Sequence, residues 1–166
     1  MTKRTTLIVF VALTTLAGAL NLRAAPGSTV AYPAGYRQWV HVKSVLVGPK
    51  SPMYESYGGL RHLYANEKAM EGYRTGRFPD GSVIVIDLFE IREKEGTTTE
   101  GPRRLIDVME KDSRRFAETG GWAFERFLGD SQTERGLTAQ ARVACYNCHS
   151  RQSQKGRDFV YSTFRK

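Results

Sequence analysis

SVIVIDLFEIR, residues 82–92, is the strongest β-strand pattern in the chain. Its β-branched and aromatic side chains fall on both faces of an extended chain, which is typical of an inner strand. Residues 103–111 carry a second strand pattern, and the polar segment between the two, residues 94–101, indicates a turn. The two strands are therefore predicted to pair as an antiparallel hairpin. Asp87 is unusual because it interrupts the apolar run.

Further strand and helix patterns flank this hairpin. Three more strands and a C-terminal strand or tail are predicted, at residues 36–47, 60–65, 121–128 and 159–164. Helices are predicted at residues 67–74, which Asn66 can cap, and at residues 138–148. The combination predicts an α+β fold, a mainly antiparallel sheet of about five strands with short helices.

The N-terminal region has the layout of an export signal. A basic start, an apolar segment and small residues before Pro26 predict a signal peptide at residues 1–25, with an uncleaved membrane anchor as the alternative. Residues 26–35 are predicted to be a linker, and residues 36–166 to form one domain. We therefore expect a periplasmic or secreted protein.

The chain is basic, with a formal net charge of +8. Its basic residues are scattered, and no run alternates with aromatic residues as in a nucleic-acid groove, so no nucleic-acid partner is expected. A solvated surface is the simpler interpretation, and steering of an acidic redox partner protein or a small anion is the alternative.

CYNCH, residues 145–149, contains both cysteines of the chain and one of its three histidines. Thiols at i and i+3 share one face of a helical turn, from which they can add to the two vinyl groups of one porphyrin. His149 then reaches the iron from the same side. The motif predicts one covalent haem c, attached through Cys145 and Cys148, with His149 as the proximal metal ligand, packed against the sheet.

Other uses of these residues fit the sequence less well. A zinc site needs about four ligands, and outside the motif only His41 and His62 remain as histidines. A thioredoxin-like redox pair is expected beside a βαβ pattern, which the sequence lacks. The sixth iron position is expected to be open, although four side chains are candidate ligands for it: Met53, Met70, Met109 and His62.

Several segments together resemble the cytochrome P460 family, which includes the cytochromes c′-β. The similar segments are GYRQWV at 35–40, YRTGRFPDGSVIV at 73–85, KDSRRF at 111–116, GWAF at 121–124, CYNCH at 145–149 and DFVY at 158–161. The resemblance implies a mainly antiparallel β-sheet homodimer and a high-spin, five-coordinate haem. The P460 members oxidise hydroxylamine and carry a lysine cross-linked to the porphyrin, whereas the c′-β members lack that bond and bind nitric oxide and carbon monoxide.

The cross-linking lysine is expected just before the Thr-Gly at the end of the first helix. This chain has Tyr73 and Arg74 there, and Lys68 lies nearly two turns earlier. The departure favours the c′-β type, unless the alignment slips so that Lys68 takes the role.

The resemblance also places residues around the open face of the iron. Phe78 stands where the family has an aromatic residue over that face, with plain core packing as the alternative. Arg61 or Arg74 could hold a polar ligand, and Asp87 could relay protons or pair with an arginine. Asp87 and Arg74 are the candidate catalytic residues.

Three functions follow, in order of preference. The first is an exported haem protein that binds nitric oxide or a similar small gaseous or nitrogenous ligand. The second is a hydroxylamine-oxidising or other redox enzyme, in which Asp87 or Glu90 would handle protons. The third is an electron carrier with Met53 or His62 as the sixth ligand.

Overall fold

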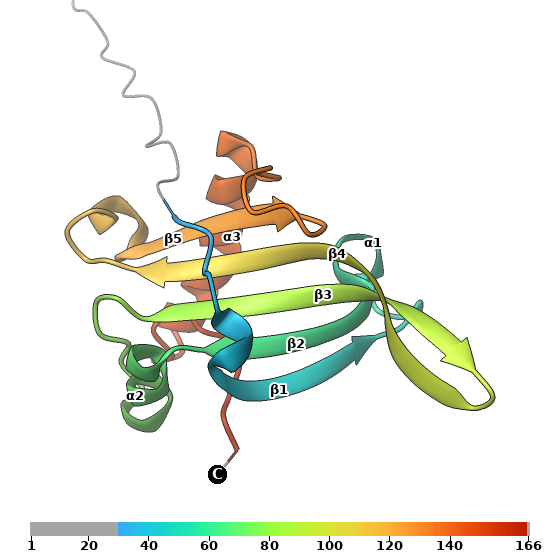
Figure 1. The fold of residues 1–166 in the computed structure, drawn as a ribbon. Coiled ribbons are helices and arrows are strands. Elements are labelled where there is room, and N and C mark those ends of the chain that lie inside the picture. The colour runs from blue at the N-terminus through green and yellow to red at the C-terminus, as the bar shows by residue number, and fades with distance from the viewer. Residues whose placement is uncertain (1–29, 166) are drawn as a thin grey trace, which may run out of the picture.

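The computed structural model describes residues 30–165, so the predicted signal peptide and residues 26–29 of the predicted linker lie outside the described residues. Five strands form one sheet in the order β1-β2-β3-β4-β5, and every neighbouring pair is antiparallel (Figure 1). The strands are β1 (Val40–Val47), β2 (Gly59–Ala65), β3 (Val83–Lys94), β4 (Thr97–Lys111) and β5 (Trp122–Leu128). The predicted α+β class and five-stranded sheet are confirmed.

Short helices complete the fold. They are η1 (Tyr36–Gln38), α1 (Tyr54–Tyr57), α2 (Glu67–Thr75), η2 (Ala117–Thr119) and α3 (Ala139–Ser153). Asn66 caps α2 by accepting a hydrogen bond from the Ala69 amide at 2.9 Å, and Thr138 caps α3 in the same way through the Ala141 amide at 3.1 Å. None of the helices within residues 30–165 is both long enough and apolar enough to cross a membrane.

The central hairpin is longer than predicted. The polar segment at residues 94–101 was expected to be a turn, but the turn contains only Glu95 and Gly96, and β4 begins at Thr97. Both turn residues have positive φ, 50° and 75°, as in the two-residue turns whose twist matches that of the flanking strands. The three threonines that follow favour an extended backbone, which explains why the strand extends over this segment.

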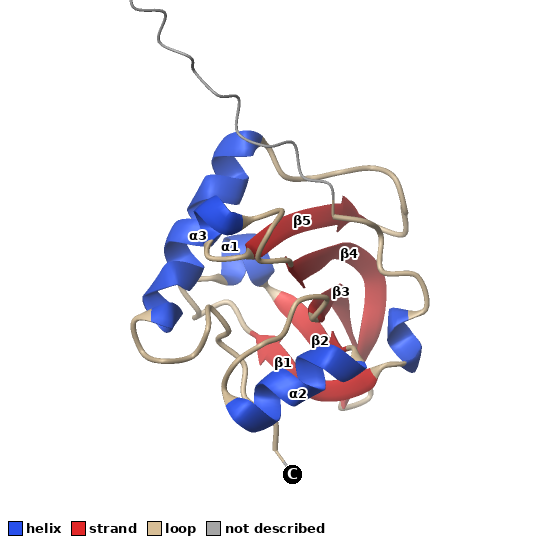
Figure 2. Ribbon diagram, turned by 90° about the vertical axis from the view of Figure 1, so that its left-hand side faces the viewer, coloured by secondary structure: helices blue, strands red, loops and turns tan. Residues whose placement is uncertain are grey.

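The two faces of the sheet pack against different parts of the chain. One, here called the α3 face, carries Leu63, Ile84 and Phe124, which pack with residues of α2 and α3. Figure 2 shows α3 along this side of the sheet. The other, the N-terminal face, carries Val85, Ile106, Val108, Ala123 and Phe127, which pack with Val30 and Tyr36. Alternate residues of β3 therefore belong to different clusters.

The N-terminal segment is part of the fold rather than a detached linker. Val30 is fully buried, and its carbonyl oxygen accepts a hydrogen bond from Arg135 Nη1 at 3.0 Å. The ring of Tyr32 packs edge-on against Phe127 with centroids 5.2 Å apart. The predicted linker thus covers part of the N-terminal face from residue 30 onward.

The C-terminal segment forms a tail without a strand, the second of the two forms predicted for it. Asp158 ties it to the α3 face, because its carboxylate accepts hydrogen bonds from the Phe78 amide at 2.9 Å, Lys111 Nζ at 2.9 Å and Trp122 Nε1 at 3.2 Å. Asp158 and Phe159 both have positive φ, 43° and 66°, so the chain turns sharply here. The turn buries Phe159 close to α3.

Candidate functional site

Helix α3 carries the whole CYNCH motif and lies against β5. Cys145 and Cys148 are both partly buried, and no disulfide joins them. Burial raises the pKa of Cys145 and the nearby Asp107 carboxylate adds to the rise, so this thiol keeps its proton at neutral pH. Two thiols thus stand one helical turn apart on a helix that faces the sheet.

His149 is held in a definite orientation. Its Nδ1 lies 2.8 Å from the carbonyl oxygen of Phe159. A carbonyl can only accept, so Nδ1 carries the proton and Nε2 keeps a lone pair. Phe124 and Tyr161 contact the ring, with centroids 4.9 Å and 5.0 Å away. Burial lowers the pKa of His149, which also favours the neutral imidazole, and this arrangement is the one that metal-binding histidines use.

The protein itself covers α3 only in part. Of the residues Ala139–Ser153, Gln152 alone is buried, although Cys145 and Tyr146 pack partly against the α3 face. A helix of this length is marginally stable by itself in water and normally relies on packing. The residues of the helix that carries the motif are therefore mostly exposed or partly buried, and a further apolar surface could still cover them.

A row of side chains across the α3 face lies beside the motif. Leu63 pairs with Ile86, Ile86 with Asp107, and Asp107 with Arg126, so these residues share one face. Arg126 donates to Asp107 with both Nε at 2.7 Å and Nη2 at 2.8 Å. This two-bonded pair leaves the carboxylate neutralised.

Tyr57 of α1 lies between two guanidinium groups on the same face. Arg126 Cζ is 5.5 Å from its ring centroid, and Arg61 Cζ is 5.7 Å away. Burial raises the pKa of Tyr57, so its hydroxyl stays protonated. The hydroxyl of Tyr57 and the two guanidinium groups thus form a small polar cluster on the same face as Leu63 and Ile86.

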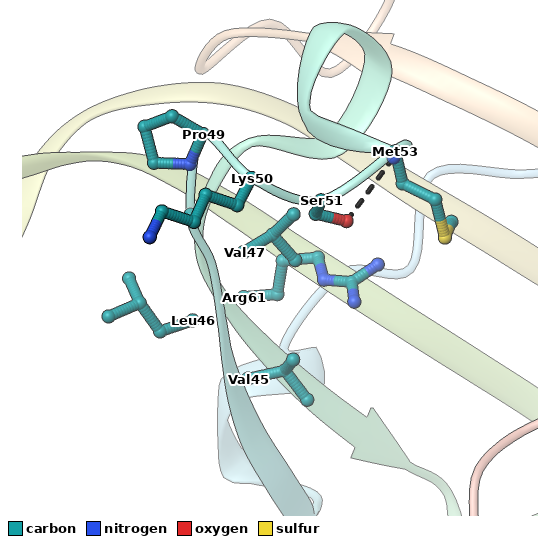
Figure 3. A pocket seen from close by; sticks show the side chains of 9 residues that line it. Val45, Leu46, Val47, Pro49, Lys50, Ser51, Met53 and Arg61 are labelled. Carbon is teal, nitrogen blue, oxygen red and sulfur yellow. Dashed lines mark hydrogen bonds between the residues drawn. The ribbon is translucent and has the colours of Figure 1, made fainter.

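An open groove of about 540 Å³ lies at the β1 end of the α3 face (Figure 3). Val45, Val47 and Met53 form apolar walls, and Arg61 lines it beside them. Val45 pairs with Arg61 in the sheet, which places both on the α3 face. None of the residues that line the groove belongs to α3, so the groove does not include the motif.

The sequence profile of the cytochrome P460 family matches residues 33–162. The chain belongs to the cytochrome P460 family. The match spans the whole sheet and the CYNCH motif, and the recognised resemblance is confirmed at the level of the family. A comparison with curated proteins finds no match.

Membership of the cytochrome P460 family makes this a c-type haem protein. The side chains present fit that group: two unpaired thiols one turn apart, an imidazole with a free Nε2, and a helix that the protein leaves largely uncovered. Cys145 and Cys148 would hold the haem, and His149 would bind its iron, in this family member. When bound, the haem supplies an iron centre for ligand binding or electron transfer.

The other predicted site residues do not gather around His149. Phe78 is buried between Tyr73 and Trp122, with centroids 5.2 Å and 5.6 Å away, which is the core-packing alternative. Arg74 is exposed near the end of α2. Lys68 is exposed too. Its Nζ donates a hydrogen bond to the Asp80 carbonyl at 3.1 Å, so its side chain does not point to the motif.

Asp87 lies on the N-terminal face, opposite the motif. It is fully buried and accepts hydrogen bonds from Tyr36 Oη at 2.6 Å, Arg37 Nε at 2.9 Å and Arg103 Nε at 2.6 Å. Asp87 therefore pairs with arginines, which is the second of the two predicted roles. The structure does not place it beside the motif as a pocket carboxylate. Glu90 is exposed farther along β3 and does not replace it.

The candidate sixth ligands are scattered. His62 lies on the N-terminal face, where Nδ1 is 2.8 Å from Ser44 Oγ and Nε2 is 2.9 Å from Glu100. Met70 belongs to α2 and is buried in the core, and Met109 packs partly buried on the α3 face. Met53 is half-exposed in the groove.

Three features of the site escaped the sequence reasoning. Lys43 pairs with Leu63 and so lies on the α3 face, where its Nζ donates to Thr163 Oγ1 at 3.3 Å. Tyr57 comes from a loop region with no pattern of its own. The third is the Phe159 carbonyl, a backbone atom that no side-chain pattern reports. The face on which Lys43 lies follows from strand alternation, but only once the register between β1 and β2 is known.

Proposed function

We propose that this chain is an exported c-type haem protein whose iron has one protein ligand, His149, and binds nitric oxide. The observation that carries the proposal is the 2.8 Å contact of His149 Nδ1 with the Phe159 carbonyl, which leaves Nε2 for the iron. Cys145 and Cys148 would attach one haem through thioether bonds. Their spacing on α3 and their unpaired state support this role.

An open sixth position is the second part of the proposal. His62 is held by Ser44 and Glu100 on the opposite face, and Met70 is packed in the core, which argues against both as ligands. A half-exposed methionine such as Met53 would have to lose its mobility to bind the iron. These placements favour a five-coordinate iron.

The chemistry of the α3 face favours ligand binding over proton-coupled turnover. Asp107, which β4 places on this face, is fixed by two hydrogen bonds from Arg126 and is a poor general base. Leu63 and Ile86 beside it are apolar. Such surroundings admit a small uncharged gas more readily than they transfer protons.

The test is the absorption spectrum of the purified holoprotein, oxidised and reduced, with and without nitric oxide. We expect a high-spin reduced haem that converts completely to its nitric oxide complex when nitric oxide is added. The spectrum of a His62→Ala control should equal that of the wild type. A reduced protein that stays six-coordinate and low-spin and does not bind nitric oxide contradicts the proposal. A spectrum lost in the His62→Ala variant points instead to an electron carrier with that ligand.

A second candidate function is the oxidation of hydroxylamine. It is favoured by Lys43, a lysine on the α3 face that could take the place of the cross-linking residue. The same spectra separate the two functions, because a porphyrin cross-link changes the absorption of the haem. Turnover of hydroxylamine with an electron acceptor would establish the enzyme.

Export and assembly belong to the proposal as well. Residues 1–25 would be removed on export to the periplasm or outside the cell, the mature protein would form a homodimer, and a redox partner protein would exchange electrons with it. The layout of residues 1–25 and the family resemblance support these points. The intact mass of the secreted protein reports cleavage and one covalent haem together.

A further inference from the structure

Arg61 is a partly buried arginine whose guanidinium makes no hydrogen bond or ion pair with residues 30–165. Its Nε is buried and makes no hydrogen bond, and no carboxylate within residues 30–165 pairs with the group. Burial also lowers its pKa. A guanidinium group loses water on burial and normally regains the lost hydrogen bonds from an anion or a carbonyl.

Other sheltered arginines of the chain show the usual outcome. Arg103 pairs with Asp87 at 2.6 Å and Arg126 with Asp107 at 2.7 Å. Arg142 pairs through Nη2 with Glu125 at 2.9 Å, although its Nε, like that of Arg61, is buried without a hydrogen bond. The only close contact recorded for the Arg61 guanidinium within the described chain is the face of Tyr57, 5.7 Å away. The difference between these paired arginines and Arg61 indicates that the Arg61 guanidinium binds a partner from outside the chain.

The surroundings of Arg61 narrow the kind of partner. Arg61 shares the α3 face with Leu63 and lines the groove together with Val45 and Val47 (Figure 3). A partly buried guanidinium beside apolar walls, with Lys50 also lining the groove, suits an anion with an apolar side, or a small anion shielded from water. The nearest carboxylate on this face, that of Asp107, is occupied by Arg126.

We propose that Arg61 is the anion-binding group of the haem site. Its ligand is an oxyanion, a carboxylate or a similar small anion, from one of two sources: a propionate of the haem, or an anion bound at the iron. The proposal rests on haem attachment at α3, but it does not require that nitric oxide is the physiological ligand.

The test compares Arg61→Gln and Arg61→Lys with Arg77→Gln, which removes an exposed arginine just after α2 and serves as the matched control. Azide is titrated into the oxidised holoproteins, and nitric oxide into the reduced ones. If Arg61 holds an anion at the iron, Arg61→Gln weakens azide binding by at least about tenfold, because a charged hydrogen bond is lost. The lysine variant should retain part of the affinity.

The reduction potential separates the two sources. If Arg61 holds a propionate, azide binding stays within about twofold, but the potential of Arg61→Gln and its dependence on pH change, since an unpaired propionate titrates. Either result supports the anion site, and nitric oxide binding reports separately on the proposed function. The proposal is overturned if Arg61→Gln matches Arg77→Gln in azide affinity, in potential and in the pH dependence of the potential.

Discussion

Two aspartates in the central hairpin show how one residue's surroundings fix its role. Asp87 on β3 and Asp107 on β4 are both neutralised by arginine, but they lie on opposite faces of the sheet. Asp87 is fully buried and joins η1 to the hairpin through Tyr36, Arg37 and Arg103. Its hydrogen bond also helps burial to raise the pKa of Tyr36 well above the usual value.

Replacing Asp87 with Asn should reduce stability without affecting the haem. The change leaves the guanidinium of Arg103, 15% exposed, without its buried counter-charge, and a loss of about 3 kcal/mol is expected for breaking a buried pair. Asp130→Asn is the matched control, because Asp130 contacts the same Arg103 from an 80% exposed position, where less than about 1 kcal/mol is expected. Urea unfolding measures both losses.

The same variants test the placement of Asp87. Their haem spectra and nitric oxide affinities should equal those of the wild type. Altered ligand binding in a folded Asp87→Asn protein would contradict this placement and show that Asp87 acts at the haem.

The sequence could identify the motif residues but not the neighbours of Asp87. Cys145, Cys148 and His149 are recognisable because their spacing is itself the chemistry. Alternation along β3 puts Asp87 on the other face from Ile84 and Ile86, yet it cannot say which face a distant helix will cover. That choice depends on where α3 packs, and so on tertiary structure, because α3 begins only at Ala139, about fifty residues after Asp87.

At the scale of elements, β5 and α3 are joined by a buried carboxylate. Glu125 is 1% exposed and accepts hydrogen bonds from Arg135 Nη1 and Arg142 Nη2, each at 2.9 Å. Arg142 lies in the first turn of α3, so this contact fixes the start of the helix that carries the motif. Burial acts to raise the pKa of Glu125, but hydrogen bonds from the Arg126 amide and the two arginines outweigh it and lower that pKa.

The lowered pKa predicts how stability depends on pH. A carboxyl whose folded pKa lies below its unfolded value, about 4.3, stabilises the fold above that value and loses the effect as the pH falls through the folded pKa. Glu125→Gln should therefore differ most from the wild type near pH 7, and the difference should narrow below about pH 4.3. Urea unfolding at several pH values measures this.

A control separates this effect from general acid unfolding. Glu118→Gln removes an exposed carboxylate and should follow the wild type at every pH. A constant difference between Glu125→Gln and the wild type down to pH 3 would show that the charge of Glu125 does not matter.

Most elements could be predicted because each has a local cause. Asn66 and Gly76 mark the ends of α2, and the apolar run marks β3. The turn between β3 and β4 was predicted too long, because polar residues were taken as a loop although the threonines prefer a strand. Helix α1 was missed because its four residues, Tyr54–Tyr57, have no apolar periodicity.

In the whole molecule, the two faces of the sheet differ in how completely the protein covers them. The N-terminal face is closed by residues of the chain, since Val30, Val85, Ile106 and Phe127 are all fully buried. The α3 face has several partly buried members where it meets the helix, among them Ile86, Met109, Cys145 and Tyr146. A haem between α3 and the sheet would cover these surfaces.

Loss of the haem should therefore loosen one side of the molecule and spare the other. In protein produced without haem attachment, hydrogen exchange of α3 amides should accelerate on the order of 100-fold, because the helix loses its main packing surface. Amides of Val85, Ile106 and Val108, in the strands under the closed N-terminal face, should change far less. A Cys145→Ala/Cys148→Ala variant should match the haem-free wild type, since without haem the thiols contribute little. Equal acceleration on both faces would show that the haem supports the whole core, and unchanged α3 exchange would mean that the haem does not pack against this helix.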